Sequence, residues 1–198
     1  DIAEQGIIFP DIKKPNKLFY KLSDAVDKLY DETMYLLSHD VDGIKYFRYQ
    51  AIKYLLPDKK QKYKNADVAS RALASMMKVL LVKRIDSSFQ AFKASLNRFS
   101  KATAAMIQMF DNGVIYIAPN LKVNEYIIEG REDELVEKIA DVIDTDPTIT
   151  VRVPEDFEPV FLTELKRDYE IVEALNKRWA KVTEDPKLDE FKKRLEEE

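Results

Sequence analysis

Residues 67–112 read DVASRALASMMKVLLVKRIDSSFQAFKASLNRFSKATAAMIQMFDN, and neither proline nor glycine occurs anywhere between Pro57 and Gly113. The stretch is rich in alanine, methionine, leucine and lysine, which are strong helix formers. Serine and alanine also recur along it, and their small side chains allow another helix to approach closely. The stretch therefore predicts one long helix, or two helices joined tightly.

The flanking sequence is also mainly helical. Apolar residues at helical spacing, together with caps and breakers, predict helices over 23–37, over 43–56, from about 132, after Pro159 and after Asp185-Pro186. Short strands are predicted over 18–22, 114–119 and 148–153. Aromatic residues at helical spacing are expected in the core: Tyr46, Phe47, Tyr49 and Tyr54. The expected fold is a mainly α helical bundle with a long central helix and two to four short β-strands.

The formal net charge of -4 conceals an uneven distribution. Residues 1–110 carry 19 basic and 12 acidic side chains, whereas residues 111–198 carry 13 and 24. Within the first part, residues 43–101 carry 14 basic side chains against three acidic ones. This asymmetry suggests a polyanion-facing region beside an acidic one. The alternative is that the two regions neutralise each other inside the fold.

Composition excludes several function classes. With no cysteine, the chain has no disulfide, no thiolate catalysis and no cysteine-ligated metal centre. No glycine stands in the pattern of a phosphate-binding loop, so ATP binding in the manner of a RecA-like motor is not expected. No apolar run approaches the ~20 residues of a membrane span, and the first residues lack the layout of a signal peptide. We expect a soluble cytoplasmic chain without a membrane partner, cut from a longer protein.

Three fragments resemble catalytic or metal sites only weakly. Residues 39–43 resemble a calcium loop but lack the remaining oxygen ligands. Asp156 with Glu164 and Lys166 resembles a metal-dependent nuclease, but the last two residues enter an amphipathic helix rather than a strand. A catalytic triad would have to use His39, and no nucleophile elbow surrounds it. We therefore expect no catalytic residue, no metal ligand and no cofactor in this chain.

Residues 76–96 carry a family resemblance through Leu80-Leu81-Val82-Lys83-Arg84-Ile85-Asp86-Ser87-Ser88. This run is similar to a segment that lies between the two RecA-like ATPase lobes of bacterial and archaeal superfamily 2 helicases, in the Swi/Snf-related branch that includes RapA-like proteins. Residues 9–23 resemble that family's passage from the first lobe into its helical linker. Eukaryotic remodelers carry a Cys-Asn-His-Pro turn that is absent here, so nucleosome remodelling is not implied.

The resemblance implies a fragment of an ATP-dependent helicase or DNA translocase. Residues 1–22 would end the first lobe, residues 23–110 would form a basic helical linker, and residues 111–198 would lead to the second lobe. ATP and magnesium would belong to the lobes. The implied partners are nucleic acid, with DNA as the expected form, and the lobes themselves. The alternative is a protein-interaction or scaffold module without nucleic-acid binding.

The role implied for Lys83, Arg84, Ser87 and Ser88 is contact with phosphate or a motor lobe. Two cations followed one helical turn later by two hydroxyls suit phosphate oxygens. Alternatively, the cations pair with Asp86 or the acidic region, and the serines only permit close packing. The full set of predicted nucleic-acid-binding residues is Lys59, Lys60, Lys62, Lys64, Lys78, Lys83, Arg84, Ser87, Ser88 and Arg98.

Overall fold

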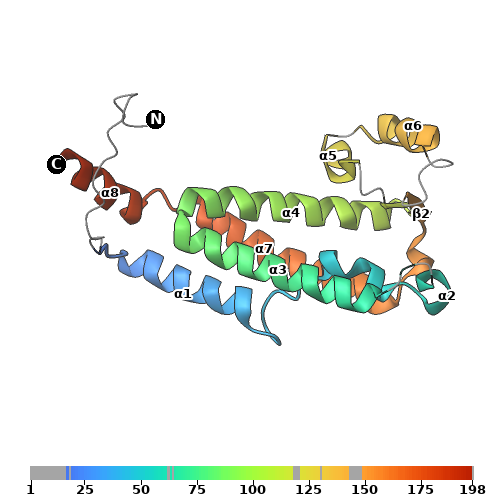
Figure 1. Cartoon of the computed structure of the whole chain (residues 1–198), viewed down its shortest axis with the longest axis horizontal. Helices are drawn as coiled ribbons and strands as arrows, with labels where there is room; N and C mark the ends of the chain where they lie inside the picture. Colours follow the sequence, from blue (N-terminus) through green and yellow to red (C-terminus); the bar gives the residue numbers. More distant parts are fainter. Residues whose placement is uncertain are drawn as a thin grey trace, which may run out of the picture.

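The computed structural model describes residues 17, 19–61, 63, 65–117, 121–129, 131–142 and 149–197. Four long helices lie side by side along the long axis: α1 (Asp24–Ser38), α3 (Ala66–Ser87), α4 (Phe89–Asp111) and α7 (Pro159–Ala180) (Figure 1). The other elements are η1 (Phe47–Tyr54), α2 (Pro57–Lys60), β1 (Ile115–Ile117), α5 (Val123–Ile128), α6 (Glu132–Val142), β2 (Thr150–Arg152), η2 (Pro154–Asp156) and α8 (Pro186–Glu196). The expected mainly helical bundle is confirmed.

The long proline-free and glycine-free stretch forms two helices rather than one. The chain is extended at Ser88, with φ -161°, and the helix direction reverses there between α3 and α4 (Figure 1). The Ser88 hydroxyl accepts a hydrogen bond from the backbone N–H of Ala91 at 3.3 Å and so caps α4. The break therefore comes from a serine N-cap.

Capping residues and prolines in the sequence predicted most of the other helix starts correctly. Ser23 caps α1 by accepting from the Val26 N–H, and Asp185 caps α8 by accepting from the Leu188 N–H. The strand predicted over 18–22 is wrong for the described residues 19–22, which are irregular. Phe19 is 79% exposed, and no neighbouring strand is available in the described chain to pair with this segment.

The helix expected over 43–56 is shorter than predicted, and it is a 3₁₀ helix. Tyr46 precedes it in the left-handed region, with φ 58°, which prevents an α-helix from running through this position. The buried carboxylate of Asp168 on α7 accepts hydrogen bonds from the backbone N–H groups of Lys45 and Phe47 at 2.8 and 2.7 Å. A tertiary contact therefore fixes the start of η1.

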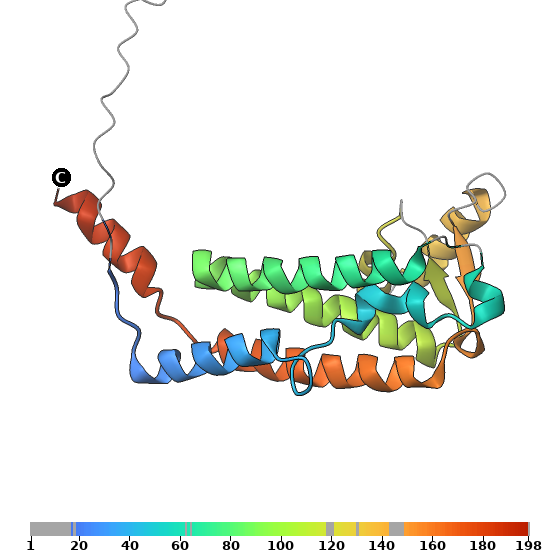
Figure 2. The same ribbon diagram turned by 60° about the horizontal axis from the view of Figure 1, so that its bottom comes forward.

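A small antiparallel sheet closes one end of the bundle. β1 pairs with β2, with Tyr116 opposite Val151, and α5 and α6 lie beside the pair (Figures 1 and 2). α8 lies at the opposite end, so the sheet and the last helix are separated by the length of the bundle.

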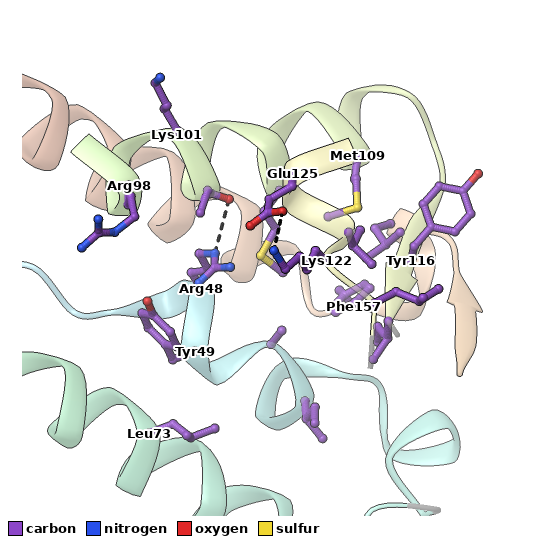
Figure 3. Close-up of a pocket in the computed structure, with 18 residues that line it drawn as sticks. Arg48, Tyr49, Leu73, Arg98, Lys101, Met109, Tyr116, Lys122, Glu125 and Phe157 are labelled. Atoms are coloured by element: carbon purple, nitrogen blue, oxygen red, sulfur yellow. Dashed lines mark hydrogen bonds and ion pairs between the residues drawn. The ribbon is translucent and has the colours of Figure 1, made fainter. Parts of the chain in front are cut away.

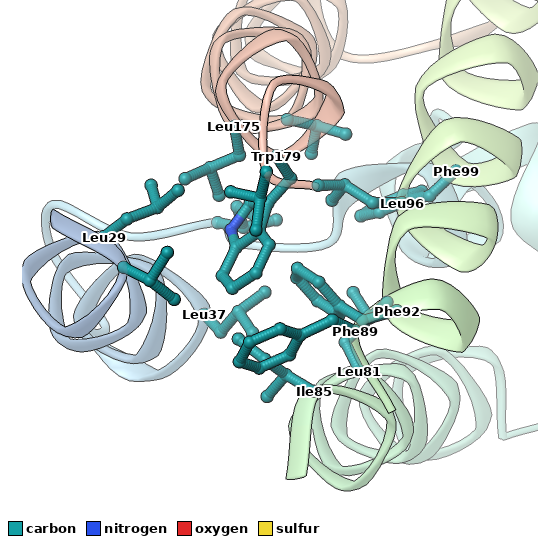
Figure 4. Close-up of a cluster of buried hydrophobic side chains, with 14 of the residues drawn as sticks. Leu29, Leu37, Leu81, Ile85, Phe89, Phe92, Leu96, Phe99, Leu175 and Trp179 are labelled. Atoms are coloured by element: carbon teal, nitrogen blue, oxygen red, sulfur yellow. The ribbon is translucent and has the colours of Figure 1, made fainter. Parts of the chain in front are cut away.

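Two clusters of buried side chains hold these elements together. The sheet-end cluster includes Phe47, Met109, Ile115, Leu135 and Phe161. The Trp179 cluster lies at the other end and joins α1, α3, α4 and α7 through Leu37, Leu81, Phe92, Leu175 and Trp179 (Figure 4). Each cluster contains residues from both the basic part of the sequence (1–110) and the acidic part (111–198). The two parts therefore share both cores.

Of the two glycines among the described residues, Gly43 is the less tolerant of substitution by alanine. An added Cβ would lie 2.4 Å from two backbone oxygens, those of Leu36 and His39, and both already accept hydrogen bonds in the turn after α1. We expect Gly43→Ala to lower the free energy of unfolding by about 2–3 kcal/mol in urea denaturation. Gly113→Ala is the control: its Cβ would meet open space, and only the positive φ of 78° costs stability, about 1 kcal/mol. Equal losses for the two variants would contradict this account.

Candidate functional site

Three of the predicted nucleic-acid-binding lysines are bound to groups of the protein itself. Lys59 lies 3.3 Å from a carboxylate oxygen of Asp156. Lys60 contacts Asp67 at 2.8 Å and lowers the pKa of that carboxyl through the hydrogen bond. Lys78 donates to the carbonyl of Ser38, near Asp40. These three side chains connect neighbouring elements, and each ammonium group lies within 4 Å of a carboxylate oxygen.

Lys83 and Arg84 are different, because they are exposed on the outer face of α3 and have no carboxylate partner among the described residues. With Ser87 they line an open groove of about 500 Å³. The other lining residues are apolar and come from the same face of the helix: Met76, Val79 and Leu80. The structure thus brings three of the predicted residues together on one surface, which we call the α3 groove.

The expected alternative partner of these two cations, Asp86, is engaged elsewhere. Its carboxylate accepts from the hydroxyl of Tyr30 on α1, and its backbone carbonyl accepts from Lys187. Burial and the Asp86 carboxylate together raise the pKa of Tyr30, which keeps its hydroxyl protonated as a donor. No ion pair joins Asp86 to Lys83 or Arg84 in the described chain, so the structure gives no support to that pairing.

The remaining predicted residues lie at other places. Ser88 caps α4, so its hydroxyl is used within the fold. Arg98 is exposed on α4, donates to Ser95 at 3.3 Å, and lines a different and larger pocket. Lys62 and Lys64 lie outside the described residues.

The sequence did not point to the exposed apolar surface of α3, part of which lines the α3 groove. Side chains along the outward face of α3 are 38–62% exposed: Val68, Met76, Val79 and Leu80. α3 also contributes the buried Leu81 and Ile85 to the Trp179 cluster, so it is apolar on both sides. The sequence signal was that only four of residues 68–82 are polar, Ser70, Arg71, Ser75 and Lys78, so that apolar side chains exceed what one buried face can hold.

The nuclease-like residues do not form a common site. Asp156 contacts Lys59 and Arg152, Glu164 contacts Lys45 at 2.9 Å, and Lys166 contacts Asp111 at 3.5 Å. Within the part of the chain that the structure describes, no group of three or more acidic or histidine side chains is arranged to hold a metal ion. The partners of these residues therefore give no support to the nuclease interpretation.

No protein-family model, curated protein or solved structure matches the chain. Among the described helices, none has both the length and the apolar character needed to cross a bilayer. The candidate function therefore depends on the α3 groove and on the chemistry of its residues.

Proposed function

We propose that this chain is a noncatalytic helical linker of an ATP-dependent helicase or DNA translocase, and that Lys83 and Arg84 contact the nucleic-acid backbone. The observation that carries the proposal is that these two cations are exposed, unpaired in the described chain and adjacent to the Ser87 hydroxyl in one groove. Cations free of protein carboxylates can bind phosphates without first breaking an ion pair. They also belong to the segment that resembles the inter-lobe region of Swi/Snf-related helicases.

The motor lobes are the second proposed partner, and the apolar face of α3 is their proposed contact. Met76 is 57% exposed and Val79 is 49% exposed, so covering this face removes apolar surface from water. In this proposal the RecA-like lobes hold ATP and magnesium, while the linker supplies a surface that a lobe contacts. Coupling requires that the open and closed lobe arrangements contact α3 differently, because only a differential interaction shifts the equilibrium between them.

Charge reversal at the groove tests the nucleic-acid contact. We expect the double variant Lys83→Glu, Arg84→Glu to bind fluorescein-labelled duplex DNA on the order of tenfold more weakly at low salt, measured by fluorescence anisotropy, because two phosphate contacts are lost. The matched control is Lys192→Glu, Lys193→Glu, which makes the same charge change on exposed positions of α8. The control should bind as the unmodified chain does.

Two outcomes would contradict the proposal. In the first, the groove variant and the α8 control lose the same affinity, so that net charge alone governs binding. In the second, the unmodified chain does not bind single-stranded or duplex DNA even at low salt, which would favour the protein-interaction module without nucleic-acid binding.

A further inference from the structure

The larger pocket, to which Arg98 belongs, lies between η1, α4, β1 and α5 and has a volume of about 840 Å³ (Figure 3). Its wall is built mainly of aliphatic and thioether side chains, including Ile52, Met106, Met109, Ile115 and Val123. A recess of this size, lined in this way, is in the range that binds ligands by apolar contact.

Positive charge gathers at the rim of the same pocket. Arg48, Arg98 and Lys101 line it, and none of the three has a carboxylate partner within the described ranges. The Arg48 Nε donates to the carbonyl of Ala102 at 3.3 Å, which holds its guanidinium beside α4 (Figure 3). A fourth cation, Lys122, is paired with Glu125 at 3.0 Å. Three separated unpaired cations suit a ligand with several negative groups.

Of the three aromatic rings that line the pocket, those of Tyr49 and Phe157 are poor stacking platforms for nucleobases, which leaves only the ring of Tyr116. The guanidinium of Arg48 lies 5.1 Å from the centroid of the Tyr49 ring, and that ring also packs against Phe99. The Phe157 ring packs against the rings of Phe110 and Phe161, whose centroids lie 5.0 and 5.4 Å from its own. Single-strand binding depends on open aromatic faces. The aliphatic wall instead suits the insertion of aliphatic or aromatic side chains.

We propose that this pocket docks an acidic peptide segment of a partner protein, which inserts apolar side chains between η1 and α4 and places its carboxylates against Arg98 and Lys101. Apolar anchors in a recess with charged contacts at the rim are the usual arrangement of a peptide-binding interface. This site goes beyond the nucleic-acid contact proposed above and uses neither Lys83 nor Arg84.

Selection from a random peptide library tests the proposal. Phage displaying random peptides would be selected against the complete 198-residue chain. The enriched peptides should combine glutamate or aspartate with leucine, isoleucine or phenylalanine. A labelled enriched peptide should bind the double variant Arg98→Glu, Lys101→Glu on the order of tenfold more weakly or worse, because rim charges become repulsive.

Two further variants separate the pocket from general effects. Ala102→Trp places a large side chain at the pocket and should also weaken peptide binding, with circular dichroism confirming that the helices persist. The α8 control Lys192→Glu, Lys193→Glu and the groove variant Lys83→Glu, Arg84→Glu should bind the peptide normally. This last result distinguishes a failure of peptide docking from a failure of the nucleic-acid proposal.

Three results would overturn the inference. One is that no peptide is enriched, and another is that the enriched peptides bind the rim variant as well as the unmodified chain. The third is that the rim variant loses affinity for a labelled oligonucleotide while peptide binding is absent, which would make the pocket a nucleic-acid site.

Discussion

Replacing Trp179 by alanine should lower the free energy of unfolding by about 3–5 kcal/mol, the largest loss that we expect for an alanine substitution among the described residues. The indole has 0% exposure, and its ring lies 5.0 and 5.3 Å from those of Phe89 and Phe92 (Figure 4). Its Nε1–H donates to the Thr33 hydroxyl on α1 at 2.9 Å. Truncation therefore leaves a large cavity where α1, α4 and α7 meet.

Urea denaturation followed by far-ultraviolet circular dichroism measures this loss. Trp179→Phe is the control, since it keeps much of the ring volume and loses the N–H group. Thr33 also donates to the carbonyl of Leu29 at 2.6 Å, and this substitution does not remove that acceptor. The phenylalanine variant should therefore lose less stability than the alanine variant. A Trp179→Ala loss below about 1 kcal/mol would show that the indole is not packed as described.

Asp168→Ala should also lower the free energy of unfolding strongly, by about 2–4 kcal/mol. The carboxylate is 1% exposed and is the acceptor for the backbone N–H groups of Lys45 and Phe47. Its removal leaves both donors without this acceptor at the point where the chain enters η1. Relief of a buried negative charge offsets part of the cost, which keeps the expected loss below that of Trp179→Ala.

The pH dependence of the free energy of unfolding is a second, independent test of the role of Asp168. Burial raises the pKa of Asp168 above its ordinary value, and it outweighs the two backbone hydrogen bonds and the charge of Arg167, which lower it. The folded chain therefore binds this proton more tightly than the unfolded chain does, and stability falls as the pH rises between the two pKa values. With Asp168→Asn as the reference that does not titrate, the stability advantage of the unmodified chain should be larger near pH ~4 than near pH ~7. An advantage that grows with pH would contradict the direction of this shift.

Elements with local signals were predictable from the sequence, whereas those fixed by distant residues were not. Ser23 and Asp185 mark the starts of α1 and α8 in the sequence, because an N-cap side chain accepts hydrogen bonds from backbone N–H groups within the next three residues. The 3₁₀ geometry of η1 depends on Asp168, which lies 121 residues beyond Phe47. The strand expected at 18–22 failed for a related reason, since a strand needs a partner that its own sequence does not specify.

The candidate site was predictable only in part. The sequence shows which side chains are charged, but it does not show which of them form ion pairs in the folded chain. Lys60 and Lys83 are both lysines in the same basic region, yet Lys60 binds Asp67, whereas Lys83 has no carboxylate partner in the described chain. Arg48 and Lys101 were not singled out, because the pocket that they line forms only when η1 packs near α4. Folding thus decides which cations stay available for a ligand.

The salt dependence of DNA binding tests most directly whether the α3 groove contacts phosphates. For the unmodified chain, the logarithm of the affinity for duplex DNA should fall linearly with the logarithm of the salt concentration, by ~0.9 per phosphate neutralised. The variant Lys83→Glu, Arg84→Glu should show a slope shallower by about 1.8, which corresponds to two lost contacts. An unchanged slope in this variant, or binding that does not depend on salt, would contradict the account.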